Sequence, residues 1–135
     1  MAQLIDSSVF IALERRRQSL QDLAALVPDD PIALSSVTAS ELLAGVHRAN
    51  TPERRLRRET FVEGVLSLVP VLPFDVRVAR VHARLWADLA AVRQSVGAHD
   101  LLIAATALAY DYAVLTENLR GFARVPGLVA RRPAW

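Results

Sequence analysis

Three acidic residues stand where an apolar, strand-like run gives way to a helical pattern. Asp6 follows one such run, Glu41 comes shortly after a second, and Asp100 leads an almost wholly apolar helical run. An ionised carboxylate beside a core needs a cation, a hydrogen-bonding partner or a cap. If the three meet, a bound divalent cation would relieve their repulsion, and oxygen ligands of this kind suit Mg²⁺ or Mn²⁺. These residue types therefore indicate metal-assisted phosphodiester chemistry with an activated water.

A parallel α/β arrangement would bring these residues together. Apolar runs bounded by turn residues predict strands near 2–5, 32–34 and 113–115, and segments with helical spacing lie between them. Strands that alternate with helices imply parallel β-α-β units covered by helices on both faces. We therefore expect an α/β fold in three layers, with a short central parallel sheet flanked by helices.

Ligands of such a sheet bind beyond the carboxyl ends of its strands, where helix N-termini also point. Asp6, Glu41 and Asn118 come after predicted strands. Asp100 opens the helix that precedes the last of these strands, and that helix should start at the same edge. We therefore expect four oxygen-bearing side chains to converge although they are far apart in the sequence.

Helix capping is the alternative explanation for each acid taken singly. Asp6 and Asp100 fit N-cap positions, and the segment from Thr38 to Glu41 fits a capping box. The coincidence of three acids at one edge favours a shared site over three separate caps. His99 adjoins Asp100, but neighbouring helical positions face about 100° apart, so we place His99 outside the predicted chemistry.

Composition limits the class of protein and its chemistry. The chain is long enough for one core, and we expect residues 1–135 to form a single domain. Cysteine is absent, which excludes thiolate and zinc-thiolate chemistry. All 16 basic residues are arginine, which excludes lysine-dependent nucleotide-binding loops and Schiff-base enzymes. No apolar run approaches about 18 residues and no leader pattern is recognisable, so we expect a cytoplasmic protein without a membrane span.

Four short motifs carry a resemblance to a known family. They are Leu4-Ile5-Asp6-Ser7-Ser8-Val9, Ser36-Val37-Thr38-Ala39-Ser40-Glu41-Leu42 with Gly45, Asp100-Leu101-Leu102-Ile103-Ala104-Ala105, and Thr116-Glu117-Asn118 with Phe122. With these motifs the chain resembles the PIN-domain ribonucleases, most closely the toxins of VapBC toxin-antitoxin pairs and their FitB-like relatives. Each motif is weak alone, but together they span nearly the whole chain in the order and spacing of the family.

The resemblance implies an activity and a set of site residues. The activity is metal-dependent endoribonuclease cleavage of structured RNA, either tRNA or rRNA. Asp6, Glu41 and Asp100 are implied as ligands of Mg²⁺, with Mn²⁺ as a substitute. Asn118 matches the fourth catalytic position, which is aspartate in some members of the family and asparagine in others.

The resemblance also implies partners and supporting residues. A homodimer is expected, as is a cognate VapB-like antitoxin that inhibits by placing an arginine among the carboxylates. Ser7 and Thr116 are expected to supply hydroxyls that order the site. Glu117 is expected to lie exposed beside it.

Two other classes of function remain open at this stage. In one, the fold is a non-catalytic PIN-like module that binds RNA or an antitoxin. In the other, it is an α/β interaction domain whose acids are caps. The run from Arg54 to Arg58 could follow an RNA backbone, but it lacks interleaved aromatic residues for base stacking and also fits a solvated helix face or an antitoxin contact. Metal-dependent cleavage would separate these alternatives.

Overall fold

The computed structural model describes all 135 residues and is built on a five-stranded sheet in the order β3-β2-β1-β4-β5, in which every neighbouring pair is parallel. The strands are β1 (Gln3–Ile5), β2 (Ile32–Ser35), β3 (Val71–Leu72), β4 (Ala113–Leu115) and β5 (Ala130–Arg131). The helices are α1 (Ser7–Arg15), α2 (Leu20–Leu26), α3 (Ser36–His47), α4 (Pro52–Leu68), α5 (Val76–Ala91), α6 (Ala98–Tyr110) and α7 (Leu119–Phe122). The predicted α/β fold with a short central parallel sheet is confirmed.

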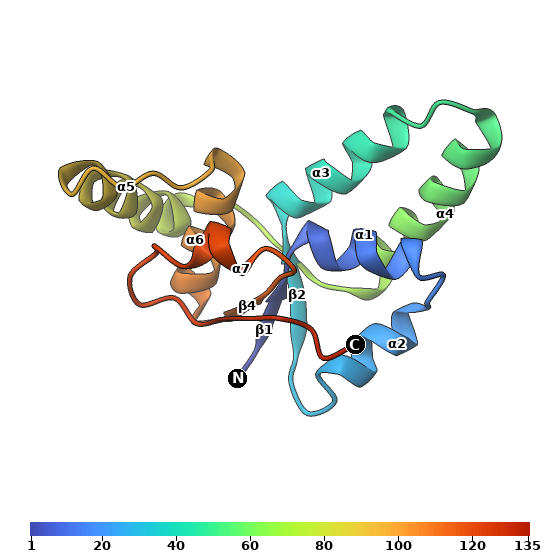
Figure 1. Cartoon of the computed structure of the whole chain (residues 1–135), viewed down its shortest axis with the longest axis horizontal. Helices are drawn as coiled ribbons and strands as arrows, with labels where there is room; N and C mark the ends of the chain where they lie inside the picture. Colours follow the sequence, from blue (N-terminus) through green and yellow to red (C-terminus); the bar gives the residue numbers. More distant parts are fainter.

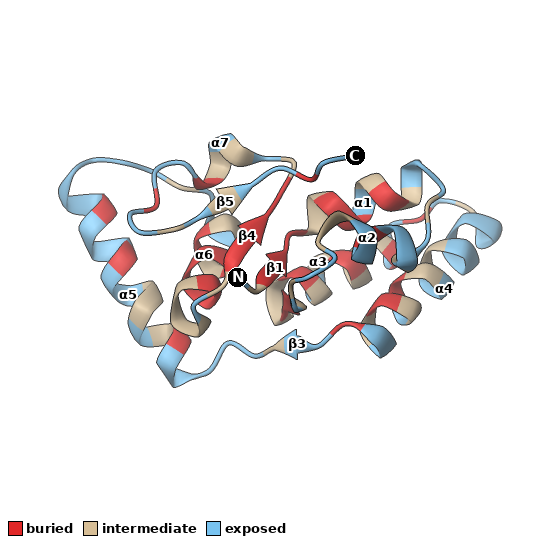
Figure 2. Ribbon diagram, turned by 90° about the horizontal axis from the view of Figure 1, so that it is seen from below, coloured by how far each residue is buried: buried red, intermediate tan, exposed pale blue.

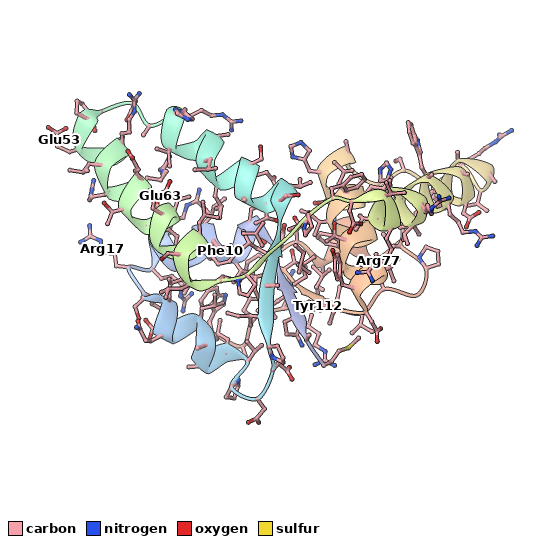
Figure 3. The ribbon with its side chains drawn as sticks, turned by 180° about the vertical axis from the view of Figure 1, so that it is seen from behind. Phe10, Arg17, Glu53, Glu63, Arg77 and Tyr112 are labelled. Atoms are coloured by element: carbon pink, nitrogen blue, oxygen red, sulfur yellow. The ribbon has the colours of Figure 1, made fainter.

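Helices cover the sheet on both sides, which gives the expected three layers. Helices α1 to α4 lie on one side and α5 to α7 on the other (Figure 1). The chain crosses between the two sides through β3, which joins α4 to α5 (Figure 2). Buried residues concentrate in the strands and on the helix faces turned toward them, whereas much of α5 is exposed (Figure 2). In Figure 3, Phe10 lies among the helices on one side of the sheet and Tyr112 lies on the other.

Successive side chains of the short strands pack alternately into the two hydrophobic clusters, one on each face of the sheet. Leu4 packs into the cluster formed with α5 and α6, and the next residue, Ile5, packs into the cluster formed with α1 to α4. Val114 and Leu115 divide in the same way. Successive strand residues point to opposite faces, so a sheet covered on both sides requires continuous apolar runs. This requirement explains why the central positions of β1, β2 and β4 are apolar.

Capping residues set the start of several helices. Thr51 Oγ1 accepts a hydrogen bond from the backbone N of Arg54 at 3.1 Å, and Asp75 Oδ1 accepts one from the backbone N of Val78 at 3.0 Å. Both residues are N-caps, of α4 and α5 respectively.

None of the helices is both long and apolar enough to cross a membrane.

The position of β1 creates the crevice in which the acids lie. The chain adds β2 and β3 on one side of β1, and later adds β4 and β5 on the other. The strand order therefore reverses between β1 and β4. In open parallel sheets such a switch point leaves a crevice at the carboxyl ends of the strands, where ligands bind.

Candidate active site

Asp6 lies in this crevice at the end of β1 and is only 4% exposed. It occupies the N-cap position of α1 but makes no side-chain cap hydrogen bond. Its Oδ2 atom instead accepts hydrogen bonds from Ser8 Oγ at 2.7 Å and from Thr116 Oγ1 at 2.8 Å. The capping explanation is therefore wrong for Asp6. Its carboxylate is held by two hydroxyls, and its Oδ1 atom is left for another partner.

A hydroxyl network fixes the turn after β4 onto Asp6. Thr116 is fully buried, and its Oγ1 lies 3.3 Å from Ser8 Oγ. The backbone N of Glu117 donates to Ser8 Oγ at 3.0 Å, and the backbone N of Asn118 donates to Thr116 Oγ1 at 2.9 Å. The predicted supporting role of Thr116 agrees with this geometry, but the α1 hydroxyl that bonds Asp6 belongs to Ser8 and not to Ser7.

Glu41 lies in the second turn of α3 and caps nothing. The N-cap of α3 is Ser35, whose Oγ accepts a hydrogen bond from the backbone N of Thr38 at 3.0 Å. The predicted capping box is therefore wrong, because the helix begins three residues before Ala39. Oε2 of Glu41 lies 3.3 Å from Nδ1 of His99, and its Oε1 is buried without any hydrogen-bonding partner.

His99, which we placed outside the predicted chemistry, nevertheless contacts one of the three acids. Its Nδ1 atom lies 3.3 Å from Oε2 of Glu41 on α3. His99 therefore contacts one carboxylate of the site and adjoins another. Only the packing of α3 against α6 could reveal this contact, because nothing in the local sequence of either helix signals it.

Asp100 is close enough to Asp6 and Glu41 for both of their negative charges to act on its carboxylate. It is the third residue of α6, Gly97 is the N-cap, and no side-chain cap bond is made there. Burial raises the pKa of Asp100 most, the negative charges of Asp6 and Glu41 raise it further, and His99 opposes them. The structure thus brings the three acids to one edge of the sheet.

Asn118 completes this edge from the exposed side. Its Nδ2 lies 3.5 Å from Oδ2 of Asp100, at the limit of a hydrogen bond. Gly121 in α7 allows this approach, because a Cβ there would lie 2.4 Å from Asn118 Nδ2 and 2.5 Å from Asp100 Oδ2. Sequence reasoning missed Gly121, since the crowding that requires it comes from Asp100 on another helix.

The acidic edge fits a hard divalent cation. Three carboxylates share it, and a buried oxygen of Glu41 has no partner. No three acidic or histidine side chains are gathered within the ligand shell of one ion as they stand. Mg²⁺ usually takes one or two protein carboxylates and completes its shell with water and substrate phosphates. The oxygen donors present meet that requirement.

The predicted basic face of α4 is partly structural. Arg58 donates to the backbone oxygen of Gly45 at 2.9 Å and to Oε1 of Glu14 at 3.3 Å. Arg58 therefore braces α4 against α3 and α1. Arg54 donates to Asn50 Oδ1 at 2.9 Å and lies on the exposed side of the helix.

Comparison with known proteins agrees with this geometry. The PIN domain profile matches residues 4–128. Ribonuclease VapC1 of Rickettsia felis is 38% identical over 128 residues, which are 95% of this chain and 93% of that protein. The tRNA(fMet)-specific endonuclease VapC of Salmonella typhimurium is 37% identical over 97 residues, which are 72% of this chain and 71% of that protein.

A solved structure extends the agreement to three dimensions. A member of the VapBC family of toxin-antitoxin systems, VapBC-5 from Mycobacterium tuberculosis, has a chain that superposes with a TM-score of 0.76 at 35% identity, covering 98% of this chain and 97% of that one. The sequence profile covers residues 4–128, which include Asp6, Glu41, Asp100 and Asn118. The chain therefore belongs to the PIN-domain family and, within it, to the VapC ribonucleases.

Proposed function

We propose that the protein is a divalent-metal-dependent endoribonuclease that hydrolyses phosphodiester bonds in structured RNA, either tRNA or rRNA. The observation that carries this proposal is the position of Asp100 beside Asp6 and Glu41, where burial and two negative charges raise its pKa. A site of this kind favours a cation, because the cation offsets both the repulsion and the burial.

Asp6, Glu41 and Asp100 would hold Mg²⁺, with Mn²⁺ as a substitute. When bound, the ion supplies neutralisation of phosphate charge and increased acidity of a water. Ser8 and Thr116 hold one oxygen of Asp6 and so orient the carboxylate toward the crevice. The exposed amide of Asn118 lies against Asp100 on the solvent side of the site. We assign Asn118 to the fourth catalytic position, beside Asp6, Glu41 and Asp100.

The substrate and partners follow from the relatives as proposals. The Salmonella relative bears the name of a tRNA-specific endonuclease, which supports tRNA as the first substrate to test. The Mycobacterium structure is of a toxin-antitoxin system, which supports a VapB-like antitoxin as the partner. An antitoxin arginine placed among the carboxylates would inhibit by pairing with groups that otherwise bind the cation. We also propose that the protein acts as a homodimer.

The decisive experiment is cleavage of end-labelled tRNA and rRNA with Mg²⁺ or Mn²⁺, in parallel with a chelator control. Asp6→Asn and Asp100→Asn remove one charge each at nearly constant shape. A metal supplies several kcal/mol of transition-state stabilisation, so each variant should lose activity on the order of 10²-fold or more. Circular dichroism of both variants checks that they remain folded.

Two outcomes would contradict this proposal in different ways. Persistence of cleavage in a folded Asp6→Asn or Asp100→Asn protein removes the assigned carboxylates from the chemistry. Binding of RNA without cleavage under either metal identifies the protein as a non-catalytic binding module.

A further inference from the structure

The aromatic side chain of Trp135 lies beside the acidic edge, in contact with Glu117. Trp135, in the segment after β5, donates a hydrogen bond from Nε1 to Oε1 of Glu117. The guanidinium carbon of Arg16 lies 4.6 Å from the centroid of the Trp135 ring. The end of the chain marked C lies near α2 in Figure 1 and near α1 in Figure 2. The fold thus pairs an indole with a basic helix end.

A hollow of about 590 Å³ lies between α1 and Trp135. This volume is within the range of small-molecule sites and is ample for one nucleotide. Its lining mixes apolar and charged side chains and is formed by Ser8, Ile11, Ala12, Arg15, Arg16, Glu117 and Trp135.

The hollow adjoins the acidic edge through shared residues. Ser8 and Glu117 line it, and the same Ser8 hydroxyl donates to Asp6 at 2.7 Å. The backbone N of Glu117 donates to Ser8 Oγ, and the side chain of Glu117 accepts from Trp135. A ligand in the hollow would therefore lie next to the carboxylate that closes β1.

The charge and exposure of the hollow suit a nucleotide. Arg15 and Arg16 bring two positive charges to the lining of the hollow, and Glu117 brings one negative charge. Arg16 is oriented by Gln18, whose Oε1 accepts from its Nε at 3.2 Å. Trp135 keeps 38% of its surface exposed, so polar contacts rather than burial hold the indole. Aromatic rings next to basic groups are the usual platform for single-stranded nucleic acid, because every base can stack on them.

We propose that this hollow is a nucleobase subsite, in which a base of a single-stranded RNA segment stacks on Trp135 and its phosphate pairs with Arg15. The proposal rests on the ribonuclease function proposed above, and it assigns the substrate a position along α1. Stacking on one aromatic side chain is worth about 1–3 kcal/mol per base. Loss of the ring should therefore weaken RNA binding roughly 5- to 150-fold.

Tryptophan fluorescence gives a direct test. The chain has two tryptophans, and Trp86 is 64% exposed on α5, so Trp86→Phe leaves Trp135 as the sole tryptophan at little structural cost. The probe is a short single-stranded 2′-O-methyl oligoribonucleotide in chelator, where no cleavage occurs. We expect quenching of Trp135 emission by this probe and none by a matched oligonucleotide made wholly of abasic residues.

Variants separate stacking from simple packing. Trp135→Phe should retain most of the affinity for the probe, whereas Trp135→Leu, which keeps an apolar side chain, should lose it. Arg15→Gln should reduce the salt dependence of binding by about one ion, whereas Arg84→Gln, an equal charge change on exposed α5, should leave that dependence unchanged. In cleavage assays Trp135→Leu should raise KM more than it lowers kcat.

The outcomes distinguish this subsite from the proposed activity. Unchanged Trp135 emission on saturation with the probe, or equal affinity of Trp135→Leu and the parent protein, overturns the subsite even if RNA is cleaved. Quenching with the expected variant pattern in a protein that never cleaves RNA supports the subsite and overturns the proposed catalysis. Failure of the protein to bind the probe at all overturns the subsite.

Discussion

The hydroxyl of Thr116 donates a 2.8 Å hydrogen bond to the carboxylate of Asp6, although 110 positions separate the two residues in the chain. The same hydroxyl oxygen accepts the backbone N of Asn118 at 2.9 Å. One buried side chain therefore orients a carboxylate at the end of β1 and also the turn that carries Asn118. Thr116 therefore aligns Asp6, at the end of β1, with Asn118, in the turn after β4.

Replacement of Thr116 by valine tests that alignment. Valine keeps the shape but removes the donor to Asp6 and leaves the backbone N of Asn118 without its partner. Loss of such a supporting contact typically costs about 10- to 100-fold in metal affinity or activity. We expect the Mg²⁺ concentration for half-maximal cleavage to rise accordingly. Thr116→Ser, which keeps the hydroxyl, should stay near wild type; equal behaviour of the valine and serine variants would contradict the assigned role.

Gly121→Ala tests the crowding at Asp100. The new Cβ would meet the ends of the Asp100 and Asn118 side chains at 2.5 and 2.4 Å, and these ends can rotate away. The fold should therefore survive while the site is displaced, and a displacement of about 1 Å can cost on the order of 10² in rate. Gly64→Ala in α4 is the matched control, because its Cβ meets nothing within 4 Å. That control should keep full cleavage activity, and its melting temperature should be unchanged or higher.

Asp100→Asn should stabilise the metal-free fold at neutral pH. The folded-state pKa of Asp100 is raised above its ordinary value of 3.8. Its favourable contribution to the free energy of unfolding is therefore present below pH 3.8 and is lost as the pH rises through the folded-state pKa. The urea midpoint of the variant in chelator should exceed that of wild type at pH 7, and the difference should vanish below pH 3.8.

Asp75 provides the control of opposite sign. Its pKa is lowered, chiefly by the hydrogen bond from the backbone N of Val78, so its contribution is present above the ordinary value and is lost as the pH falls. Asp75→Asn should therefore give no gain in urea resistance at pH 7. A gain of equal size in both variants would show that the effect at Asp100 is only a general loss of negative charge.

Divalent cations should stabilise the wild-type fold. A ligand that binds only the folded state at about 100 times its dissociation constant adds about 2.7 kcal/mol to the free energy of unfolding. Urea titrations with Mg²⁺ and with chelator should differ by about this amount for wild type. Glu41→Gln should reduce the difference, because the unpartnered oxygen of Glu41 is a proposed ligand. A wild-type protein that cleaves RNA but gains no stability from Mg²⁺ would contradict binding to the free enzyme.

The sequence predicted the layers of the fold and the convergence of the acids because both follow from local signals. Apolar runs specify strands, parallel strands share a carboxyl edge, and Asp6 and Asp100 come at helix starts. Side-chain partners do not follow in this way. Thr38 and Glu41 fit a capping box by type, but Ser35 accepts the backbone N of Thr38 and shifts the start of α3. Ser35, Ser36 and Thr38 could each act as the N-cap by residue type. Which of them does so depends on where β2 ends, and this is set by its pairing with neighbouring strands.

Contacts between distant segments were beyond sequence reasoning for a related reason. Helix geometry separates His99 from Asp100 on the surface of α6, but the contact of His99 with Glu41 depends on how α3 lies against α6. Trp135 has no periodic pattern around it, so nothing local associates it with Arg16 or Glu117. These are the residues that shape the edge of the site, and their positions depend on the completed fold.

The strand order also sets when the site can exist during synthesis. β1 is made first but pairs with β4, which is made after about four-fifths of the chain. At about 5–20 residues per second, Asp6 waits roughly 5 to 20 s for Thr116 to emerge. A growing chain therefore has only one of the two hydroxyls that hold Asp6, that of Ser8, and for most of that time it lacks Asp100 as well. Late pairing of β4 thus delays an RNA-cutting activity until the segment that contains Thr116 has left the ribosome.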